Sequence, residues 1–571
     1  MVAKQFKIQH FLLLWLILNV IQAAFMEMHV DEAYYWVYSR FLDWGYYDHP
    51  PMVAVFIKLG TWLSQSEFGA RMISVITNTV SLYLLWKIVE PYAKNPWLFS
   101  WLYFSFVIFH IFGFIVTPDS PLLFFTVLYL YFLSNYIKQE RLEWTTVLVL
   151  AVAAAGMMYS KYHGILLLFF SIIAHWQLLK RPSFWLIVLL AVAMYLPHLW
   201  WQYQNDYPSV QYHILERTNR LYKLSYTTDF LVSILLVTGP LTSWYLFYRF
   251  YKQRIQGDHF LRILRVSFWG IMLFFLFASS KNNVQAQWVL LAYLPLFVLT
   301  YIALAQLANI PKWFYTLLYI TAGLMICVRL AVIIPIPALQ NIKIVNAYWG
   351  HEELAHNIAQ YAADRPVLFE NGFQKPSSYN FYNNRLDGFA YDSRDYRKTQ
   401  YDYWPIEDSI RHKDVYLVRN HSFENEAQDT IPSRLKGTWF GMQIDSLRTY
   451  QKVNITCHNL PDTLVQGRTY QLALTIHNPY EDEITFSNDG QRWPLYFEYG
   501  FVQYMWTAGR YYGIKNDYQS IKIPAKSSIN YEITLLTPDD VLGEWSFFLS
   551  LRTDPFQGSR NSIKYSVFID K

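Results

Sequence analysis

Long apolar runs dominate the first 340 residues of the chain. A membrane-spanning helix needs about 20 mostly apolar residues, and the pattern supplies about eleven such runs. Several neighbouring runs are separated by only a few residues, which predicts helical hairpins. A cleaved signal peptide is the alternative for the first run, but further apolar runs follow at once, so we expect an uncleaved span. The predicted spans are 9–26, 71–90, 97–116, 120–137, 144–160, 163–179, 184–202, 228–249, 266–280, 286–307 and 313–335.

The loops between these spans alternate in charge. The positive-inside rule places the more basic set of loops in the cytoplasm. The other loops, which are 27–70, 117–119, the turn around 161, 203–227 and 280–285, then face outward. An odd number of spans leaves the N-terminus inside and the tail after about 340 outside. The basic set contains Lys4, Lys7, Lys87, Lys94, Lys138, Arg141, Lys180, Arg181, Arg249, Lys252, Arg254, Arg262, Arg265 and Lys312.

The tail has a different pattern, in which short elements alternate with turn residues. Helices near 351–362 and 376–384 and strands at 366–370 and 414–419 predict a small α/β domain, which we place at 341–440. From there to the end, repeated short strands predict a β-sandwich of the immunoglobulin-like kind, at 441–571. The strands expected there are 450–457, 469–477, 529–536, 545–552 and 563–569.

Composition agrees with a membrane protein and excludes some other classes. Only 16% of the residues are charged, against about 25% in an average soluble domain. Aromatic residues make up 19% of the chain, which suits a protein with many membrane–water interfaces. The net charge is +5 and no Lys/Arg block is present, so we expect no nucleic-acid partner. Cys327 and Cys457 lie in unlike surroundings and imply no disulfide framework.

The first outward loop, 27–70, carries the strongest chemical signal. Its first half contains five acids and two histidines, and the pattern from Val30 to Trp44 permits an amphipathic helix on the membrane surface. Acids beside lipid are costly unless they face water, a cation or a substrate. Transfer of a sugar from a lipid phosphate needs a carboxylate that takes the acceptor's proton and a cation that holds the phosphate. The alternative is that these acids only solvate a surface helix.

Several short motifs, in order along the chain, resemble one family of membrane enzymes. They are Asp31-Glu32-Ala33-Tyr34-Tyr35-Trp36, Gly45-Tyr46-Tyr47-Asp48-His49-Pro50-Pro51, Thr117-Pro118-Asp119-Ser120-Pro121, Ser160-Lys161-Tyr162 and Gln400-Tyr401-Asp402-Tyr403-Trp404-Pro405. Together they resemble the polytopic glycosyltransferases of the GT-C type. The most similar groups are the bacterial aminoarabinose-transferase-like enzymes and the dolichyl-phosphate-mannose-protein mannosyltransferase-like enzymes. The resemblance implies the polytopic GT-C fold for the membrane part.

The resemblance also implies roles for the acids. Asp31 matches the family's essential loop acid, the expected catalytic base or acceptor-positioning group, and Glu32 could share this work. Asp119 matches a second acid, expected near Asp31. Asp48 and His49 match the second part of the loop and would contact the acceptor, the sugar or a cation. Asp31 and Asp119 could hold a divalent ion such as magnesium or manganese, joined by His49 if the ion were zinc.

Four basic residues are candidates for binding the carrier phosphate. Lys161 stands in a short outward loop within a matched motif, where an ammonium is a good point charge for phosphate; its alternative is an interfacial snorkelling lysine. Lys281 lies in a later outward loop. Arg71 opens the second span and is either an anchor or a phosphate ligand. Arg329 lies inside the last span, where an arginine is a functional candidate or a snorkelling residue near the helix end.

The sequence departs from the family pattern in two places. Val284-Gln285-Ala286-Gln287-Trp288 carries glutamines where many relatives have an acid and an asparagine, which puts a charged acceptor contact at Gln285 in doubt. The predicted sandwich has no counterpart among the family's core motifs. Arg217 and Arg220, in the loop 203–227, are further candidates for gating the donor, and a solvated surface explains them equally well.

These observations lead to one hypothesis and its rivals. We expect an enzyme of the bacterial inner membrane that moves a sugar from undecaprenyl phosphate, or a similar polyprenyl phosphate, to an envelope glycan, lipid or protein at the periplasmic face. The family's single displacement implies inversion at the sugar carbon. A protein O-mannosyltransferase-like enzyme is the nearest alternative. A lipid-linked sugar transporter or flippase would be expected to show inverted repeats, and the sequence shows none.

Overall fold

The computed structural model describes residues 6–216, 222–255, 257–424, 426–503 and 509–571. The chain forms two compact units, Met1–Trp349 and Gly350–Lys571. We call them the membrane unit and the tail unit. The boundary lies close to the one that the sequence predicted at 340, and each unit is described by itself.

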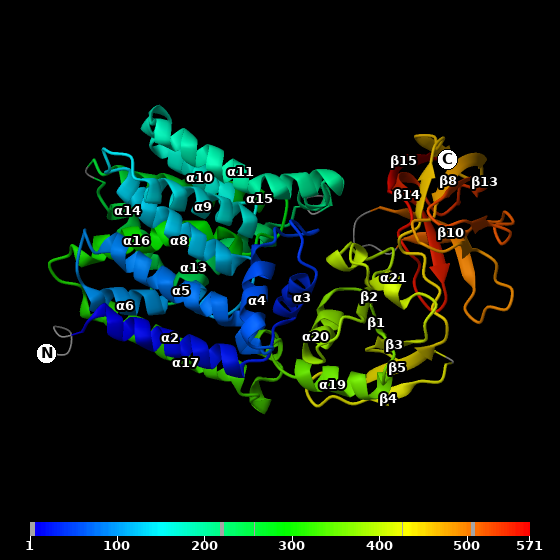
Figure 1. The fold of residues 1–571 in the computed structure, drawn as a ribbon, viewed down its shortest axis with the longest axis horizontal. Coiled ribbons are helices and arrows are strands. Elements are labelled where there is room, and N and C mark those ends of the chain that lie inside the picture. Colours follow the sequence, from blue (N-terminus) through cyan, green and yellow to red (C-terminus); the bar gives the residue numbers. More distant parts are fainter. Residues whose placement is uncertain (1–5, 217–221, 256, 425, 504–508) are drawn as a thin grey trace. The chain divides into compact units, whose positions relative to one another are not determined.

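The membrane unit is a helical bundle (Figure 1). Within the described residues, six segments are long and apolar enough to cross a membrane. α5 packs between α2 and α8, and α9 packs between α8 and α11. The predicted polytopic helical fold is therefore confirmed. The six segments are α2 (Ile8–Phe25), α5 (Glu67–Val89), α11 (Pro182–Gln204), α15 (His259–Ala278), α17 (Lys312–Ile333), and Ala286–Ala305, which contains α16 (Leu290–Ala305).

The other five predicted spans are shorter or broken helices. α8 (Asp119–Tyr136) and α9 (Trp144–Ser160) have 18 and 17 residues. The run 97–116 is split into α6 (Pro96–Ser105) and α7 (Val107–Ile111), and the run 163–179 into α10 (Gly164–Ala174) and the 3-10 helix Trp176–Lys180. The run 228–249 is split into α13 (Leu224–Thr238) and α14 (Ser243–Lys252), bent by 89°. The prediction of continuous helices at these three runs was wrong.

Local chemistry explains the breaks. Gly239 has a φ of +134° and precedes a proline, so the helix cannot continue there. The break at Phe106 involves no glycine or proline, and polar side chains satisfy backbone groups around and beyond it. His110 Nε2 lies 2.6 Å from the Phe104 carbonyl oxygen, and Asn78 donates to the Phe112 carbonyl at 3.1 Å. Backbone can leave the helical pattern at membrane depth only where the protein supplies such partners.

The first loop, 27–70, folds into two helices, α3 (Val30–Arg40) and α4 (Met52–Leu63). α3 is shorter than the predicted helix, and eight of its 11 residues are buried. It is therefore an internal element, and the predicted amphipathic surface helix is wrong. α4 packs closely on α5, because a Cβ at Gly60 would lie 2.0 Å from the Gly69 carbonyl oxygen. Only glycine permits that approach.

The first part of the tail unit is the predicted α/β domain. Its five-stranded sheet has the order β2-β1-β3-β5-β4, in which β1, β2 and β3 are parallel. α19 (His351–Ala362) and α20 (Gln374–Tyr382) cover it (Figure 1). β5 crosses the boundary expected at 440, so this part extends to Ile444. The strands are β1 (Val367–Glu370), β2 (Gly388–Tyr391), β3 (Val415–Arg419), β4 (Asp429–Ile431) and β5 (Trp439–Ile444).

The second part is a β-sandwich. One sheet has the strand order β11-β10-β14-β15-β7 and another has the order β13-β8-β6. Alternate residues of both sheets, such as Leu474 and Phe497, enter one shared apolar core. The predicted sandwich is therefore present, and its immunoglobulin-like topology stays a prediction. The strands are β6 (Asn454–Cys457), β7 (Thr463–Val465), β8 (Thr469–His477), β9 (Ile484–Thr485), β10 (Leu495–Val502), β11 (Arg510–Gly513), β12 (Lys522–Ile523), β13 (Ser528–Leu536), β14 (Gly543–Thr553) and β15 (Tyr565–Asp570).

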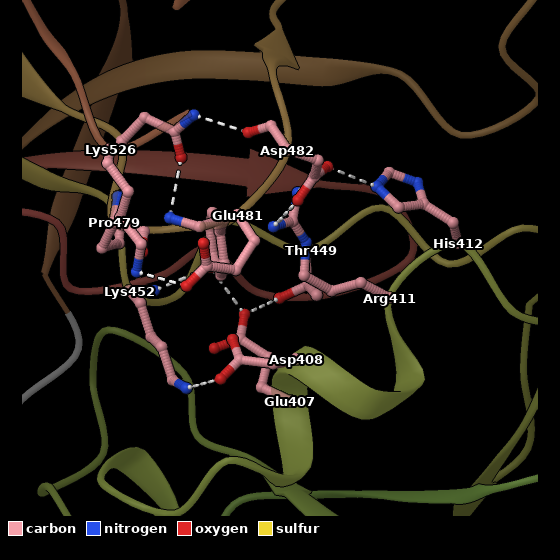
Figure 2. A network of polar contacts seen from close by, with 12 residues as sticks. Glu407, Asp408, Arg411, His412, Thr449, Lys452, Pro479, Glu481, Asp482 and Lys526 are labelled. Atoms are coloured by element: carbon pink, nitrogen blue, oxygen red, sulfur yellow. Dashed lines mark hydrogen bonds and ion pairs between the residues drawn. The ribbon is translucent and has the colours of Figure 1, made fainter. Parts of the chain in front are cut away.

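A polar network joins these two parts of the tail (Figure 2). It starts from α21 (Ile406–Ile410) and the residues after it. The buried Glu407 carboxylate accepts hydrogen bonds from Thr449 Oγ1 at 2.7 Å and from Tyr480 Oη at 2.8 Å. Arg411 forms an ion pair with Asp482 at 3.0 Å. These contacts explain why the α/β domain and the sandwich form one compact unit.

Asp392, just after β2, makes the stability of the tail unit depend on pH. Its buried carboxylate accepts hydrogen bonds from Gly372 N and Thr399 Oγ1. Burial, followed by the charge of Asp402, raises the pKa of Asp392 from 3.8 to about 7. Between these values only the unfolded chain releases the proton, so this contribution to stability is lost as the pH rises through the window.

We therefore expect Asp392→Asn to stabilise the tail unit relative to wild type progressively as the pH rises from about 5 to about 7.5. The measurement is thermal unfolding of the purified full chain in detergent at several pH values. A difference between the two proteins that stays constant over this range would contradict the assignment.

Candidate active site

The N-terminus of α3 fixes the two motif acids. His29 caps the helix: its Nδ1 accepts a hydrogen bond from Asp31 N at 3.3 Å, and its backbone N–H donates to Glu32 Oε2 at 3.1 Å. This reciprocal pair is a capping box, and acids in the first turn also complement the helix dipole. The start of the helix therefore fixes the directions in which the Asp31 and Glu32 side chains point. The side chain of Asp31 is 46% exposed, whereas that of Glu32 is fully buried.

Glu32 and Arg71 form a buried ion pair that anchors the site. Arg71 Nε and Nη2 donate to the two carboxylate oxygens of Glu32 at 2.9 and 2.6 Å. The other Arg71 donors bind the carbonyl oxygens of Ala23, Met26 and Glu27 at the end of α2. A guanidinium has five N–H donors, and these contacts use all five. Arg71 is thus a structural anchor, in place of the phosphate contact that was its alternative.

Glu32 also links α3 to the segment that precedes α8. Its Oε1 accepts a hydrogen bond from Val116 N at 2.8 Å, immediately before the motif that contains Asp119. With two contacts to Arg71 and one to His29 N, the carboxylate is saturated. A buried, fully bonded carboxylate that joins three chain segments positions its neighbours. We therefore assign Glu32 a positioning role, which replaces the shared catalytic role expected from its place beside Asp31.

Asp119 and Lys161 meet, although 42 residues separate them. Asp119 opens α8, and Lys161 follows the last residue of α9. The Lys161 ammonium donates to both Asp119 carboxylate oxygens, at 2.8 and 2.7 Å. The two side chains are 9% and 6% exposed. An ammonium has three donors, and the described contacts use two of them for Asp119. The pair therefore brings a nearly buried cation to the region of α3.

Tyr35 is a buried residue on which the charges of three acids act. It stands one helical turn after Asp31 on α3. Burial, followed by the charges of Asp31, Asp48 and Asp119, raises the pKa of the Tyr35 hydroxyl far above its ordinary value. Three acids from three segments therefore act on one side chain. We call Asp31, Tyr35, Asp48, Asp119 and Lys161 the carboxylate cluster.

Asp48 joins the cluster from the second part of the loop, and His49 follows it at the edge of the cluster. The buried Asp48 carboxylate accepts a short hydrogen bond from Tyr38 Oη on α3. The Asp48 carbonyl oxygen lies 3.0 Å from His213 Nε2. The His49 ring lies 5.7 Å from the Tyr35 ring and 6.4 Å from the His213 ring, measured between centroids. The structure thus brings both predicted residues to the edge of the cluster.

The end of α11 holds the loop in place. A Cβ at Gly45 would lie 2.3 Å from the Trp201 ring, so glycine lets this indole pack directly on the backbone. Trp201 Nε1 donates to Asp43 Oδ2 at 2.7 Å, and His198 Nδ1 lies 2.7 Å from the Trp44 carbonyl oxygen. His198 is thus a polar contact between segments. These contacts explain why the second motif has a glycine, Gly45, at this position.

Two of the predicted phosphate ligands are not brought to the cluster. Arg329 Nε donates to His110 Nδ1 and Nη2 donates to Asn19 Oδ1, both at 2.9 Å, and the guanidinium lies 5.3 Å from the Trp15 ring. None of these partners belongs to the cluster. Lys281 is exposed in the turn after α15. Arg217 and Arg220 lie outside the described residues.

The predicted metal ligands do not form a metal site in the structure. Over the described ranges, no three His, Cys, Asp or Glu side chains gather in a way that could hold a metal ion. The carboxylate of Asp119 faces the Lys161 ammonium instead, which supplies the positive charge that a cation would otherwise bring. The metal requirement expected at Asp31, Asp119 and His49 stays a prediction.

Sequence reasoning missed two tyrosines that the structure places in the site. Tyr35 and Tyr38 both stand in or beside the motif of the first loop, but their side chains carry no charge that would mark them. The signal was their spacing, because residues three or four apart in a helix share a face. Tyr35 follows Asp31 by four residues and Tyr38 by seven, so a helix starting at 30 places all three on one face.

Comparison with known proteins agrees with the motifs. Residues 48–201 match the family model described as dolichyl-phosphate-mannose-protein mannosyltransferase. The chain is 25% identical over 282 residues to a lipid A galacturonosyltransferase, RgtD, from Rhizobium johnstonii. This match covers 47% of the chain and 58% of the relative, so the chain spans less than two thirds of that protein.

The same fold occurs in solved structures. The crystal structure of ArnT from Cupriavidus metallidurans in the apo state aligns with a TM-score of 0.58 at 13% identity, covering 76% of the chain and 97% of ArnT. The structure of the same protein bound to undecaprenyl phosphate aligns with a TM-score of 0.55, at the same identity and coverage. The chain thus has the fold of a polytopic helical membrane protein, shared with these structures. The matched family model and the relative are consistent with the family resemblance that the motifs indicated.

Proposed function

We propose that this chain is a membrane glycosyltransferase that moves a sugar from a polyprenyl-phosphate carrier to an acceptor of the bacterial envelope. One observation carries the proposal: the charges of Asp31, Asp48 and Asp119, from three segments, all act on the buried Tyr35, and the Lys161 ammonium is paired with Asp119. This arrangement offers a half-exposed carboxylate, Asp31, and a nearly buried cation, Lys161. Transfer from a lipid phosphate needs both groups.

The proposed reaction is a single displacement. The acceptor hydroxyl attacks the anomeric carbon while the bond from that carbon to the carrier phosphate breaks, which inverts the configuration. Asp31, the most exposed acid of the cluster, takes the proton of the hydroxyl or orients it. Lys161 offers its remaining N–H to the departing phosphate, while Asp119 fixes the ammonium. Asp48 and His49 line the acceptor side.

The substrates follow from chemistry shared with the relatives. The carrier is undecaprenyl phosphate or a similar polyprenyl phosphate, because ArnT, which shares the fold, was solved with undecaprenyl phosphate bound. The likeness to a lipid A galacturonosyltransferase favours a lipid or glycan acceptor. The matched family description favours the second candidate, a protein acceptor. The site would face the periplasm, with the basic loops in the cytoplasm.

Purified protein in detergent, supplied with a panel of polyprenyl-phosphate sugars and envelope extract, tests the enzyme class. We expect labelled sugar to appear in an acceptor as carrier phosphate is released. The same protein in proteoliposomes tests the rival function. Movement of a lipid-linked sugar across the bilayer, without transfer to any acceptor, would favour a flippase and contradict the proposal.

We expect Asp31→Asn to lower the transfer rate by about 100-fold or more, because the amide cannot take the proton. The thermal unfolding temperature should stay near that of wild type, since Asp31 is half-exposed. Asp43→Asn is the matched control, because Asp43 is an exposed acid of the same loop and an amide oxygen can still accept from Trp201. Full activity of Asp31→Asn would overturn the assignment of Asp31.

A further inference from the structure

A polar cavity lies in the membrane unit, far from the carboxylate cluster. Its volume is about 400 Å³, and it opens between the end of α14, the start of α15 and the end of α16. Its polar lining includes Tyr92, Arg249, Lys252, Arg254, Asp258 and Gln306. Three of these residues are basic and one is acidic. The cavity therefore has an excess of positive charge.

The single acid is already engaged by the protein. Asp258 Oδ2 accepts a hydrogen bond from Tyr92 Oη at 2.8 Å, and Oδ1 accepts from Leu261 N at 3.0 Å, where it caps α15. Within the part of the chain that the structure describes, Arg249, Lys252 and Arg254 form no ion pair. A further cation stands nearby, because the Lys138 ammonium lies 5.9 Å from the Tyr92 ring. The protein thus gathers cations here without neutralising them.

Arg249 gives the cavity a positioned donor. Its Nη2 donates to the Ala303 carbonyl oxygen at 2.7 Å, which fixes the guanidinium against α16. Its Nε is buried and has no hydrogen-bond partner among the described residues. A buried N–H without a partner is unfavourable, and the described residues supply no acceptor for this one. A basic loop that only sets the orientation of the protein in the membrane would explain the charges, but it would not explain the cavity or this buried donor.

The position of the cavity points to a membrane lipid. Tyr92 follows the last residue of α5, whose other end carries Arg71 beneath the carboxylate cluster. At 1.5 Å per residue, α5 separates the two places by about 30 Å, roughly the thickness of the hydrocarbon core. Tyr251, next to Lys252 at the cavity end of α14, is an exposed aromatic residue. Such side chains mark the headgroup level of a bilayer.

We propose that this cavity binds a phosphate-bearing anion, and that the headgroup of an anionic membrane lipid supplies it. A guanidinium matches phosphate geometry through paired donors, and Lys252 adds a point charge. Basic pockets between membrane helices on the cytoplasmic side are suited to such headgroups. The site would hold α14, α15 and α16 together at the face opposite the chemistry. It does not depend on the proposed sugar transfer.

The double variant Lys252→Gln/Arg254→Gln tests the site, because both side chains are exposed and neither supports the fold through an ion pair. Lys180→Gln/Lys312→Gln is the matched control, since it removes two exposed charges from the same set of basic loops outside the cavity. Binding of phosphatidylglycerol to the purified full chain is measured by native mass spectrometry and by the rise in unfolding temperature, with phosphatidylcholine as reference. Inorganic phosphate and glycerol 3-phosphate form a second arm.

We expect the cavity variant to bind phosphatidylglycerol about 10- to 30-fold more weakly than wild type, and the control to bind it almost unchanged. Equal binding by the two variants would overturn the site. If free phosphate and glycerol 3-phosphate stabilised the wild type as strongly as the lipid, and the cavity variant alone lost the effect, the phosphate site would stand and the lipid as its source would be overturned. No arm requires turnover, so failure here is distinct from failure of the proposed function.

Discussion

Replacing Lys161 by methionine is expected to lower the rate of sugar transfer by about 100- to 1,000-fold, the usual cost of removing one positioned group that stabilises charge in a transition state. The Lys161 ammonium is nearly buried and is oriented by two hydrogen bonds to Asp119. A preformed cation in such surroundings acts strongly on a departing phosphate, because little water screens it. Initial rates of labelled-sugar transfer at saturating donor measure the effect.

Two further variants separate charge from packing at this position. Lys161→Arg keeps the positive charge and should retain part of the activity, although its planar donors fit Asp119 differently. Lys58→Met is the matched control, because Lys58 is an exposed lysine of the first loop outside the cluster. If Lys161→Met were folded and transferred sugar as fast as Lys58→Met, Lys161 would have no role in the chemistry.

Replacing Arg71 by methionine is expected to lower the free energy of unfolding by about 3–5 kcal/mol, because it leaves a buried carboxylate without its cation. Arg71 and Glu32 are both fully buried, and three carbonyl oxygens at the end of α2 lose their donors as well. α3 and the segment before α8 should then lose their common anchor. Thermal unfolding of the purified protein in detergent, followed by tryptophan fluorescence, measures the loss.

The double variant Arg71→Met/Glu32→Gln distinguishes a broken pair from lost packing. It removes the unpaired charge, so it should be more stable than Arg71→Met alone. Arg141→Met is the matched control, because Arg141 is exposed. An unfolding temperature of Arg71→Met that equals that of Arg141→Met would show that the buried pair contributes little.

Much of the fold could be predicted because long apolar runs and short alternating runs have few alternatives. The span expected at 144–160 coincides with α9, and the strand expected at 469–477 coincides with β8. The break within 97–116 could not be predicted, because no glycine or proline marks Phe106. Side chains from other segments, such as Asn78, stabilise that break by forming hydrogen bonds with backbone polar groups.

The site shows the same division. The motifs identified Asp31, Asp48, Asp119 and Lys161; in the structure the charges of the three acids act on Tyr35, and Lys161 pairs with Asp119. The sequence could not show that Glu32 forms an ion pair with Arg71. The two residues are 39 positions apart, and only the fold makes them partners. For the same reason the sequence could not show that Asp119 pairs with Lys161.

The most direct test of the central claim is a parallel measurement of sugar transfer and carrier-phosphate release by the purified full chain, comparing wild type, Asp31→Asn, Lys161→Met and the control Asp43→Asn. The account predicts equal molar amounts of glycosylated acceptor and carrier phosphate from wild type and Asp43→Asn, and almost none of either from the two cluster variants. Undiminished formation of both products by folded Asp31→Asn and Lys161→Met would contradict it.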